Sequence, residues 1–196
     1  MSVSTAAGSK RHALADRGHD LYQTPREAVL ALLGVECILR RVWEPACGPG
    51  AIASVLREKG HDVLATDLVD YDTLHQDAVA DFLRSDFHGL DTEGRVIVTN
   101  PPFKDAHLFV ARALQHAPYV AMLLRLAFLE SERRRDILDQ SCLARVHVFR
   151  KRLPMMHREG WEGPKASSAT AFAWFIWERT YKGPPQLHRV SWEDFA

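Results

Sequence analysis

Residues 41–67 constrain the fold more than any other part of the chain. They predict a strand over 41–45, a turn over 46–50, a helix over 51–59 that Gly60 ends, and a second strand over 61–67 that ends in Asp67. A strand, a glycine turn, a helix and an acid at the next strand end are how doubly wound parallel sheets bind nucleotides. The turn carries only two glycines, Gly48 and Gly50. The missing third glycine favours an adenosine ligand without phosphates over a dinucleotide.

A second constraint is the tetrapeptide Asn100-Pro101-Pro102-Phe103, which follows a predicted buried strand over 95–99. Each proline fixes φ and lacks a backbone donor, so this turn is rigid. It holds one amide side chain, one carbonyl and one aromatic face in place. That set suits a planar amine, which needs acceptors for its hydrogens and a ring on which its base can stack. The alternative is a rigid strand-to-helix loop without further function.

The rest of the chain continues the alternation of helices and strands. Thr24 and Pro25 predict the N-cap and first position of a helix that ends near Gly34. Further predicted elements are a helix over 106–114, a central strand over 119–124, a charged helix over 131–140, and strands over 143–149 and 170–177. We expect a mobile polar tail over 1–20, one domain over 21–182 with a basic loop over 150–168, and a C-terminal tail over 183–196.

Four segments, taken in order, resemble the motifs of S-adenosylmethionine-dependent amino-methyltransferases, and most closely those of DNA N6-adenine methyltransferases. They are Glu44–Gly50, Asp67, Ser85–Phe87 and Asn100–Phe103. The segment Tyr22–Pro25 is similar to the N-terminal cofactor motif of the same family. The resemblance covers residues 22–103 by motif and continues to about Trp177 by strand order. It implies an α/β fold of the Rossmann-like class I methyltransferase type, with a seven-stranded, mostly parallel sheet whose last strand is antiparallel.

The resemblance also implies roles for individual residues. Asn100, Pro101, Pro102 and Phe103 would be catalytic, and S-adenosyl-L-methionine would be the cofactor. Asp86 would receive the adenine amine of that cofactor, and the alternative is an acid in a surface turn. The full implied cofactor set is Tyr22, Thr24, Pro25, Glu44, Ala46, Cys47, Gly48, Gly50, Asp67, Leu68, Asp86, Phe87 and Asn100.

Charge is distributed unevenly along a chain of zero formal net charge. Residues 133–165 carry nine Lys or Arg against four acids, which leaves the remainder negative. A basic segment on a neutral body is compatible with a phosphate-facing surface, and a solvated helix face explains the charge equally well. The residues that we expect to contact nucleic acid are Arg133, Arg134, Arg150, Lys151, Arg152, Arg158 and Lys165.

Composition excludes several other classes of protein. The three cysteines, Cys37, Cys47 and Cys142, have no paired spacing, so we expect reduced thiols in the cytoplasm. The ten histidines form no ligand-spaced cluster, so we expect no metal. No apolar run approaches membrane-spanning length, and residues 1–17 lack the apolar core of a signal peptide.

The expected function is therefore methyl transfer to N6 of adenine in DNA, by a small enzyme of the kind that prophages carry. Within 196 residues there is no room for a separate target-recognition domain. Several alternatives share the same chemistry: N4-cytosine methylation, methylation of adenine in RNA, and methylation of a protein glutamine amide. A non-catalytic cofactor-binding subunit is a further alternative. The sequence does not indicate an oligomeric state.

Overall fold

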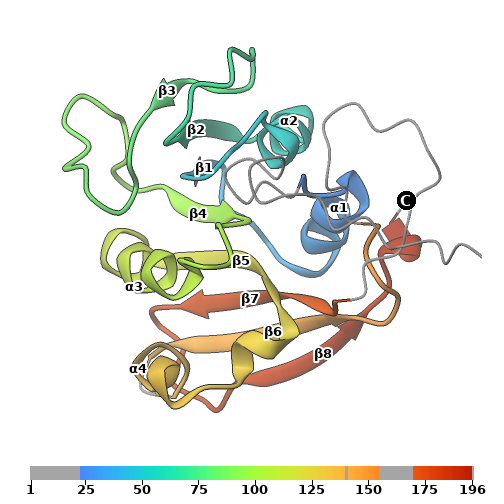
Figure 1. Cartoon of the computed structure of the whole chain (residues 1–196). Helices are drawn as coiled ribbons and strands as arrows, with labels where there is room; N and C mark the ends of the chain where they lie inside the picture. Colours follow the sequence, from blue (N-terminus) through green and yellow to red (C-terminus); the bar gives the residue numbers. More distant parts are fainter. Residues whose placement is uncertain (1–22, 140, 155–169, 196) are drawn as a thin grey trace, which may run out of the picture.

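The computed structural model describes residues 23–139, 141–154 and 170–195. They form an eight-stranded sheet in the order β3-β2-β1-β4-β5-β7-β6-β8 (Figure 1). The strands are β1 (Arg41–Glu44), β2 (Asp62–Asp67), β3 (Ala78–Val79), β4 (Val96–Thr99), β5 (Tyr119–Arg125), β6 (Leu143–Phe149), β7 (Phe172–Glu178) and β8 (Gln186–Val190). The α-helices are α1 (Arg26–Val35), α2 (Ala51–Glu58), α3 (Ala106–His116) and α4 (Arg135–Leu138).

Strand direction follows the predicted pattern. Strands β1 to β5 pair in parallel, and β7 runs antiparallel to both of its neighbours, β5 and β6. The predicted Rossmann-like methyltransferase architecture is therefore confirmed. The sheet has one strand more than expected, because β8 pairs in parallel with β6 at its edge.

Helices cover the sheet on both faces, with α1 and α2 on one side and α3 and α4 on the other (Figure 1). Strand β7 is buried on both faces, which explains its continuous apolar sequence. Its two tryptophans point in opposite directions. The Trp174 indole N–H donates to the Ala28 carbonyl of α1 at 2.8 Å, and the Trp177 indole N–H donates to the Ile137 carbonyl of α4 at 2.8 Å. Strand β7 thus positions one helix on each face of the sheet.

We expected a C-terminal tail over 183–196, and for residues 186–195 this expectation is wrong. They form β8 and a 3-10 turn, η4 (Trp192–Phe195), which packs on the same core as α1. The Phe195 ring occupies the space where a side chain on Gly34 would lie, and α1 continues past this glycine to Val35. Four of the five residues of β8 are exposed, so the segment lacks the apolar alternation that would have predicted a strand.

The charged helix expected over 131–140 is shorter than predicted. A 3-10 turn, η3 (Glu132–Arg134), precedes the single turn of α4. Leu138 is the buried residue of this segment, so there is little packing to extend the helix.

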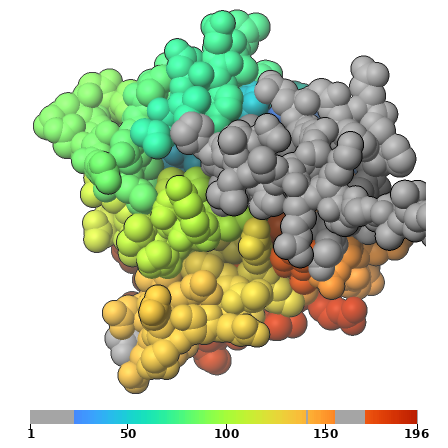
Figure 2. Space-filling model, in the orientation of Figure 1, coloured from blue at the N-terminus to red at the C-terminus, as the bar shows by residue number. Residues whose placement is uncertain are grey.

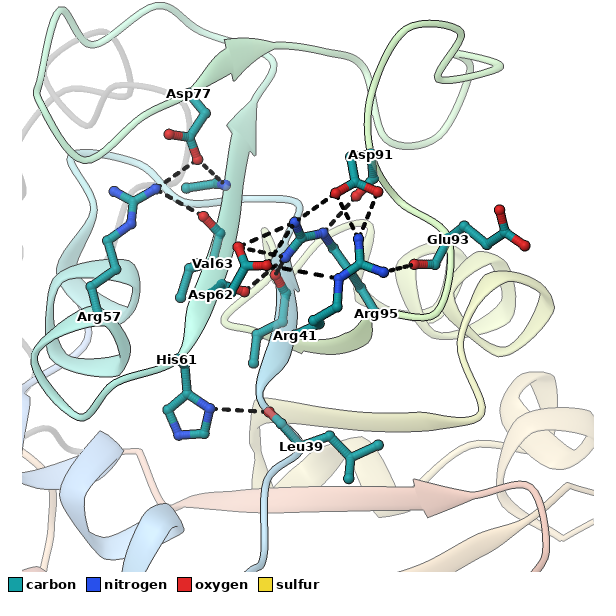
Figure 3. A network of polar contacts seen from close by, with 12 residues as sticks. Leu39, Arg41, Arg57, His61, Asp62, Val63, Asp77, Asp91, Glu93 and Arg95 are labelled. Carbon is teal, nitrogen blue, oxygen red and sulfur yellow. Dashed lines mark hydrogen bonds and ion pairs between the residues drawn. The ribbon is translucent and has the colours of Figure 1, made fainter.

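A polar network fixes the amino-terminal ends of β1, β2 and β4 (Figure 3). Arg95 is 6% exposed, and it donates to the Val42 carbonyl and to the Asp62 carboxylate, each at 3.2 Å. Asp91 accepts from both Arg41 and Arg95. This edge of the sheet satisfies its charges internally and leaves the carboxyl edge for a ligand.

Candidate active site

A cavity of about 410 Å³ opens at the carboxyl ends of β1, β2 and β4, which is where doubly wound sheets bind ligands. Both sequence motifs contribute to its wall. The lining residues are Gln23, Thr24, Glu44, Pro45, Ala46, Cys47, Pro49, Ala51, Ile52, Asp67, Leu68, Val69, Tyr71, Asp81, Phe82, Leu83, Arg84, Asn100, Pro101, Pro102, Phe103, Lys104, Asp105 and Phe109.

The glycine turn is tied to the end of the neighbouring strand. The Gly48 N–H donates to Asp67 Oδ2 at 2.8 Å, and the Cys47 N–H donates to the Thr66 carbonyl at 3.0 Å. Gly50 has a φ of 96°, and a Cβ there would collide with the His75 side chain. The two glycines therefore shape the turn without lining the cavity, while Ala46 and Cys47 form the wall that a ligand would touch.

Glu44 is a buried carboxyl group in the cavity wall. It is 1% exposed, and its Oε2 atom has no hydrogen-bond partner among the described residues. Burial raises its pKa well above 4.5, and the charge of Asp67 adds to this rise, while a backbone hydrogen bond from Ala53 opposes it. An orphaned buried carboxylate oxygen is costly unless a ligand supplies a donor. A cationic amine, such as the one that an amino-acid moiety carries, fits this position.

Asn100 begins the turn between β4 and α3, and its side chain is oriented by the segment before α1. Its Nδ2 atom donates to the Thr24 hydroxyl at 3.1 Å. This bond fixes the orientation of the amide and identifies Oδ1 as its acceptor atom. Thr24 was predicted to cap α1, but the N-cap position is Pro25 and no side chain caps the helix. The hydroxyl is instead used to fix the amide of Asn100.

The segment after β3 contributes the acid Asp81 to the cavity wall. The sequence had indicated Asp86 for this position. Residues 81–87 contain two Asp-Phe pairs five residues apart, and Asp81-Phe82 lines the cavity. The Asp86 side chain is 74% exposed and contacts His88 at 3.3 Å. Phe87 is buried edge-on against Trp43, so this second pair belongs to the core and not to the cavity.

Arg112 of α3 determines which of the two acids faces the cavity. Its guanidinium donates to the Phe82 carbonyl at 2.9 Å and to the Ser85 carbonyl at 2.5 Å, and it lies 5.3 Å from the centre of the Phe87 ring. These contacts hold the segment 81–87 with its first acid toward the cavity. The sequence carries no local signal for this choice, because Arg112 is far along the chain and its partners are backbone atoms.

The predicted nucleic-acid contacts have mixed outcomes. Arg134 donates to the carbonyls of Ala127, Phe128 and Glu130, so it has a structural role. Arg150 and Lys151 pair with two acids of η4, at 3.0 and 2.6 Å. Arg133 and Arg152 are exposed. Arg158 and Lys165, most of the loop 150–168, and the cofactor candidate Tyr22 lie outside the described residues.

Two basic residues that the sequence did not single out lie closer to the cavity. The Arg84 and Lys104 side chains line its wall and are 88% and 74% exposed. On the face shown in Figure 2, the yellow-green α3 lies between the green segment that contains Arg84 and the yellow to orange segment that contains Arg133.

Three further outcomes concern cofactor, metal and membrane. Of the implied cofactor residues, Thr24, Glu44, Ala46, Cys47, Asp67, Leu68 and Asn100 line the cavity, and Pro25, Gly48, Gly50, Asp86 and Phe87 do not. Within the described ranges, no group of three His, Cys, Asp or Glu side chains could hold a metal ion. No helix in this part of the chain is long and apolar enough to cross a membrane.

Comparison with solved structures places this fold among methyltransferases. A modification subunit assigned to a type I restriction enzyme of Vibrio vulnificus aligns with a TM-score of 0.62 and 16% identity over 89% of this chain and 48% of its own. A protein of Pyrococcus horikoshii assigned as an RNA methyltransferase aligns at 0.60 and 14%, over 86% and 91%. A TehB-like SAM-dependent methyltransferase of Corynebacterium glutamicum aligns at 0.50 and 18%, over 85% and 92%.

The chain thus spans about half the length of the restriction-enzyme subunit. At these identities the likeness establishes the fold and not the activity. No family model matches the sequence, and no curated protein matches it.

Proposed function

We propose that this protein transfers a methyl group from S-adenosyl-L-methionine to the exocyclic amine of a nucleobase, with N6 of adenine in DNA as the target. One observation carries the proposal. The rigid turn Asn100–Phe103 opens into the same cavity as the glycine turn, Asp67 and the buried Glu44. An amine-holding turn and a nucleoside-binding turn therefore share one space, as a transfer between two bound molecules requires.

The cavity residues fit the cofactor at three points. Glu44 offers its orphaned carboxylate oxygen to the ammonium group. Asp67 accepts from the Gly48 and Val69 N–H groups and retains lone pairs for ribose hydroxyls. Asp81, with one carboxylate oxygen bonded to the Leu83 N–H, takes the role of acceptor for the adenine amine. When bound, the cofactor supplies an electrophilic methyl group on its sulfonium.

The Asn100–Phe103 turn acts on the substrate amine. The lone pair of the amine nitrogen is delocalised into the ring of the base, which makes the amine a weak nucleophile. The Asn100 amide oxygen and the Pro101 carbonyl would accept its two hydrogens, so that the nitrogen becomes pyramidal and its lone pair is exposed. With the cofactor bound, a carbon–nitrogen bond would form at this nitrogen as the carbon–sulfur bond of the methyl donor broke, and the surplus proton would leave to water. Fixed dipoles supply the stabilisation without reorganisation.

The Phe103 ring would provide a platform for the target base, and base–aromatic stacking is worth about 1–3 kcal/mol. In duplex DNA the base must leave the stack, at a cost of a few kcal/mol. Arg84 and Lys104 are positioned at the cavity to attract a polyanion. Two of the similar structures, a restriction-enzyme subunit and a protein assigned as an RNA methyltransferase, also support a nucleic-acid substrate.

The test is transfer of a labelled methyl group to duplex DNA, single-stranded DNA and total RNA, followed by digestion and identification of the modified nucleoside. We expect N6-methyladenine in DNA, and no label with Asn100→Ala. N4-methylcytosine or label in RNA alone would keep the chemistry and change the substrate. Cofactor binding without transfer to any nucleic acid would overturn the proposal in favour of a protein amide substrate or a non-catalytic subunit.

A further inference from the structure

Arg125 lies directly on the aromatic ring of the proposed catalytic turn. It is the last residue of β5, and its guanidinium carbon is 4.4 Å from the centre of the Phe103 ring. The residue is exposed, and no carboxylate of the described residues lies within ion-pair distance of it. Nothing in the sequence pattern had singled it out.

The surrounding chain holds Arg125 and Phe103 in this arrangement. Arg125 pairs in register with Phe172 at the start of β7, and the Leu126 N–H donates to the Ala171 carbonyl at 2.8 Å. The Phe172 ring packs at 5.6 Å from the Phe103 ring with a tilt of 43°. Two strand ends and the proposed catalytic turn therefore meet at one corner, where the Arg125 guanidinium lies over the Phe103 ring.

The other arginines that stack on aromatic rings are used differently. Arg112 and Arg134 each lie over a ring while their N–H groups donate to backbone carbonyls. Those two guanidinium groups are held in place by hydrogen bonds to the backbone. The Arg125 guanidinium makes no such hydrogen bond to the described residues, so its five N–H donors remain for solvent or for a ligand.

We propose that Arg125 is a substrate-positioning residue. Its guanidinium covers Phe103 until the target base stacks there, and it then pairs with the phosphate next to the target nucleotide. This inference rests on the proposed function and narrows it to a substrate that carries phosphates.

Two physical arguments favour this exchange. A cation–π contact at an exposed site is weaker than the stacking of a nucleobase on an aromatic ring, so the base displaces the guanidinium. A guanidinium stays charged and binds phosphate through two parallel hydrogen bonds. Once displaced, it remains tethered at the strand end beside the bound nucleotide. A glutamine amide in a protein offers no phosphate for it.

The experiment compares the full chain with Arg125→Ala and Arg125→Lys, and it uses Arg40→Ala as the matched control. Arg40 is an exposed arginine just before β1. It lies at the amino-terminal ends of the strands, whereas Arg125 lies at the carboxyl end of β5. Binding of a fluorescent adenine-containing oligonucleotide is measured across a salt series, alongside cofactor affinity and the steady-state kcat and KM for the oligonucleotide.

We expect Arg125→Ala to weaken oligonucleotide binding about 10-fold and to lower the slope of log affinity against log salt by about 1, as loss of one phosphate contact predicts. KM rises more than kcat falls, and cofactor affinity stays within about twofold of the parent. Arg125→Lys keeps the salt slope and restores part of the affinity, because it keeps the charge without the planar group. Arg40→Ala leaves every one of these quantities at the parent value.

A purely structural role would leave the salt slope unchanged, and that result in Arg125→Ala would overturn the inference while the parent still methylates nucleic acid. A parent protein that binds cofactor but neither binds nor methylates any oligonucleotide overturns the proposed function itself, and this inference with it. The two failures are therefore distinguished by the parent protein alone.

Discussion

Glu36 and Glu44 are two buried glutamates that the fold treats in opposite ways. The Glu36 side chain, at the end of α1, is 5% exposed and accepts from Tyr119, Arg145 and His147 at 2.9, 2.6 and 2.6 Å. Burial acts to raise its pKa, but these hydrogen bonds outweigh burial and lower the pKa from 4.5 to about 2. Glu36 joins α1 to β5 and β6 and lies away from the cavity.

Glu44 is 1% exposed, yet one of its oxygens has no partner among the described residues and its pKa is raised. The fold can supply three donors to a carboxylate, as Glu36 demonstrates, and it does not do so in the cavity wall. Perturbed carboxyl groups of this kind concentrate at functional sites. The comparison distinguishes a carboxylate that stabilises the fold from one that we propose binds a ligand, and five predictions test this distinction and the site around it.

The largest expected effect is on stability, from Glu36→Gln. The change leaves Arg145 and His147 without their buried anion, and breaking such a pair destabilises by about 3–5 kcal/mol. Chemical denaturation measures the loss. The matched control is Glu178→Gln, which removes the more exposed partner of Arg145 and should cost less than about 1 kcal/mol. Equal losses in the two variants would contradict the assignment of Glu36 as the structural centre.

Asn100→Ala should abolish most catalysis and leave the fold intact. Removal of one fixed acceptor from a reaction centre lowers kcat by about 100- to 1,000-fold, and cofactor affinity should stay within a few-fold. Thr24→Val keeps the amide but removes its hydroxyl partner, so its kcat should fall less. Turnover at the parent rate in Asn100→Ala would remove this residue from the mechanism.

Acid should weaken the protein through Glu36. Because its folded pKa lies below its unfolded value, its contribution is complete above pH 4.5 and is lost as pH falls from 4.5 toward 2. The shift corresponds to about 3 kcal/mol. The measurement is the difference in unfolding free energy between the parent and Glu36→Gln as a function of pH. A difference that stays constant across this range would show that the carboxylate is not ionised in the fold.

Asp81→Asn should weaken cofactor affinity about 10-fold, because a neutral amide replaces a charge-assisted acceptor. Asp86→Asn should leave that affinity unchanged, since Asp86 lies outside the cavity. Isothermal titration calorimetry compares the two variants directly. The reverse order of effects would restore Asp86 to the adenine-binding role that the sequence indicated.

Glu44→Gln should change the stability only slightly, and with the opposite sign to Glu36→Gln. A neutral side chain avoids burying an unpartnered charge, so the free protein gains about 1 kcal/mol. Cofactor affinity should fall about 10-fold with loss of the ammonium partner. Thermal unfolding with and without cofactor reads out both effects. A destabilised free protein would mean that Glu44 belongs with Glu36 as a structural carboxylate.

The sequence predicts local units of this molecule well. The unit from β1 to β2 and the turn at Asn100 each carry their signal within a short window, where glycines, prolines and apolar runs have direct conformational meaning. Strand β8 has no such signal, because four of its five residues are exposed at a sheet edge. The choice of Asp81 over Asp86 depends on Arg112, and the pairing of Lys151 depends on Glu193. These contacts join residues whose proximity only the folded chain establishes.

The hydrogen bond between Asn100 and Thr24 has a consequence for the order of events during synthesis. It joins residues 76 positions apart, and the bond from Trp174 to the Ala28 carbonyl spans 146. On a ribosome that adds about 5–20 residues per second, α1 therefore waits many seconds for β7. Long-range closures of this kind slow folding. The segment that orients the Asn100 amide is therefore synthesised well before the strand that holds α1 in place.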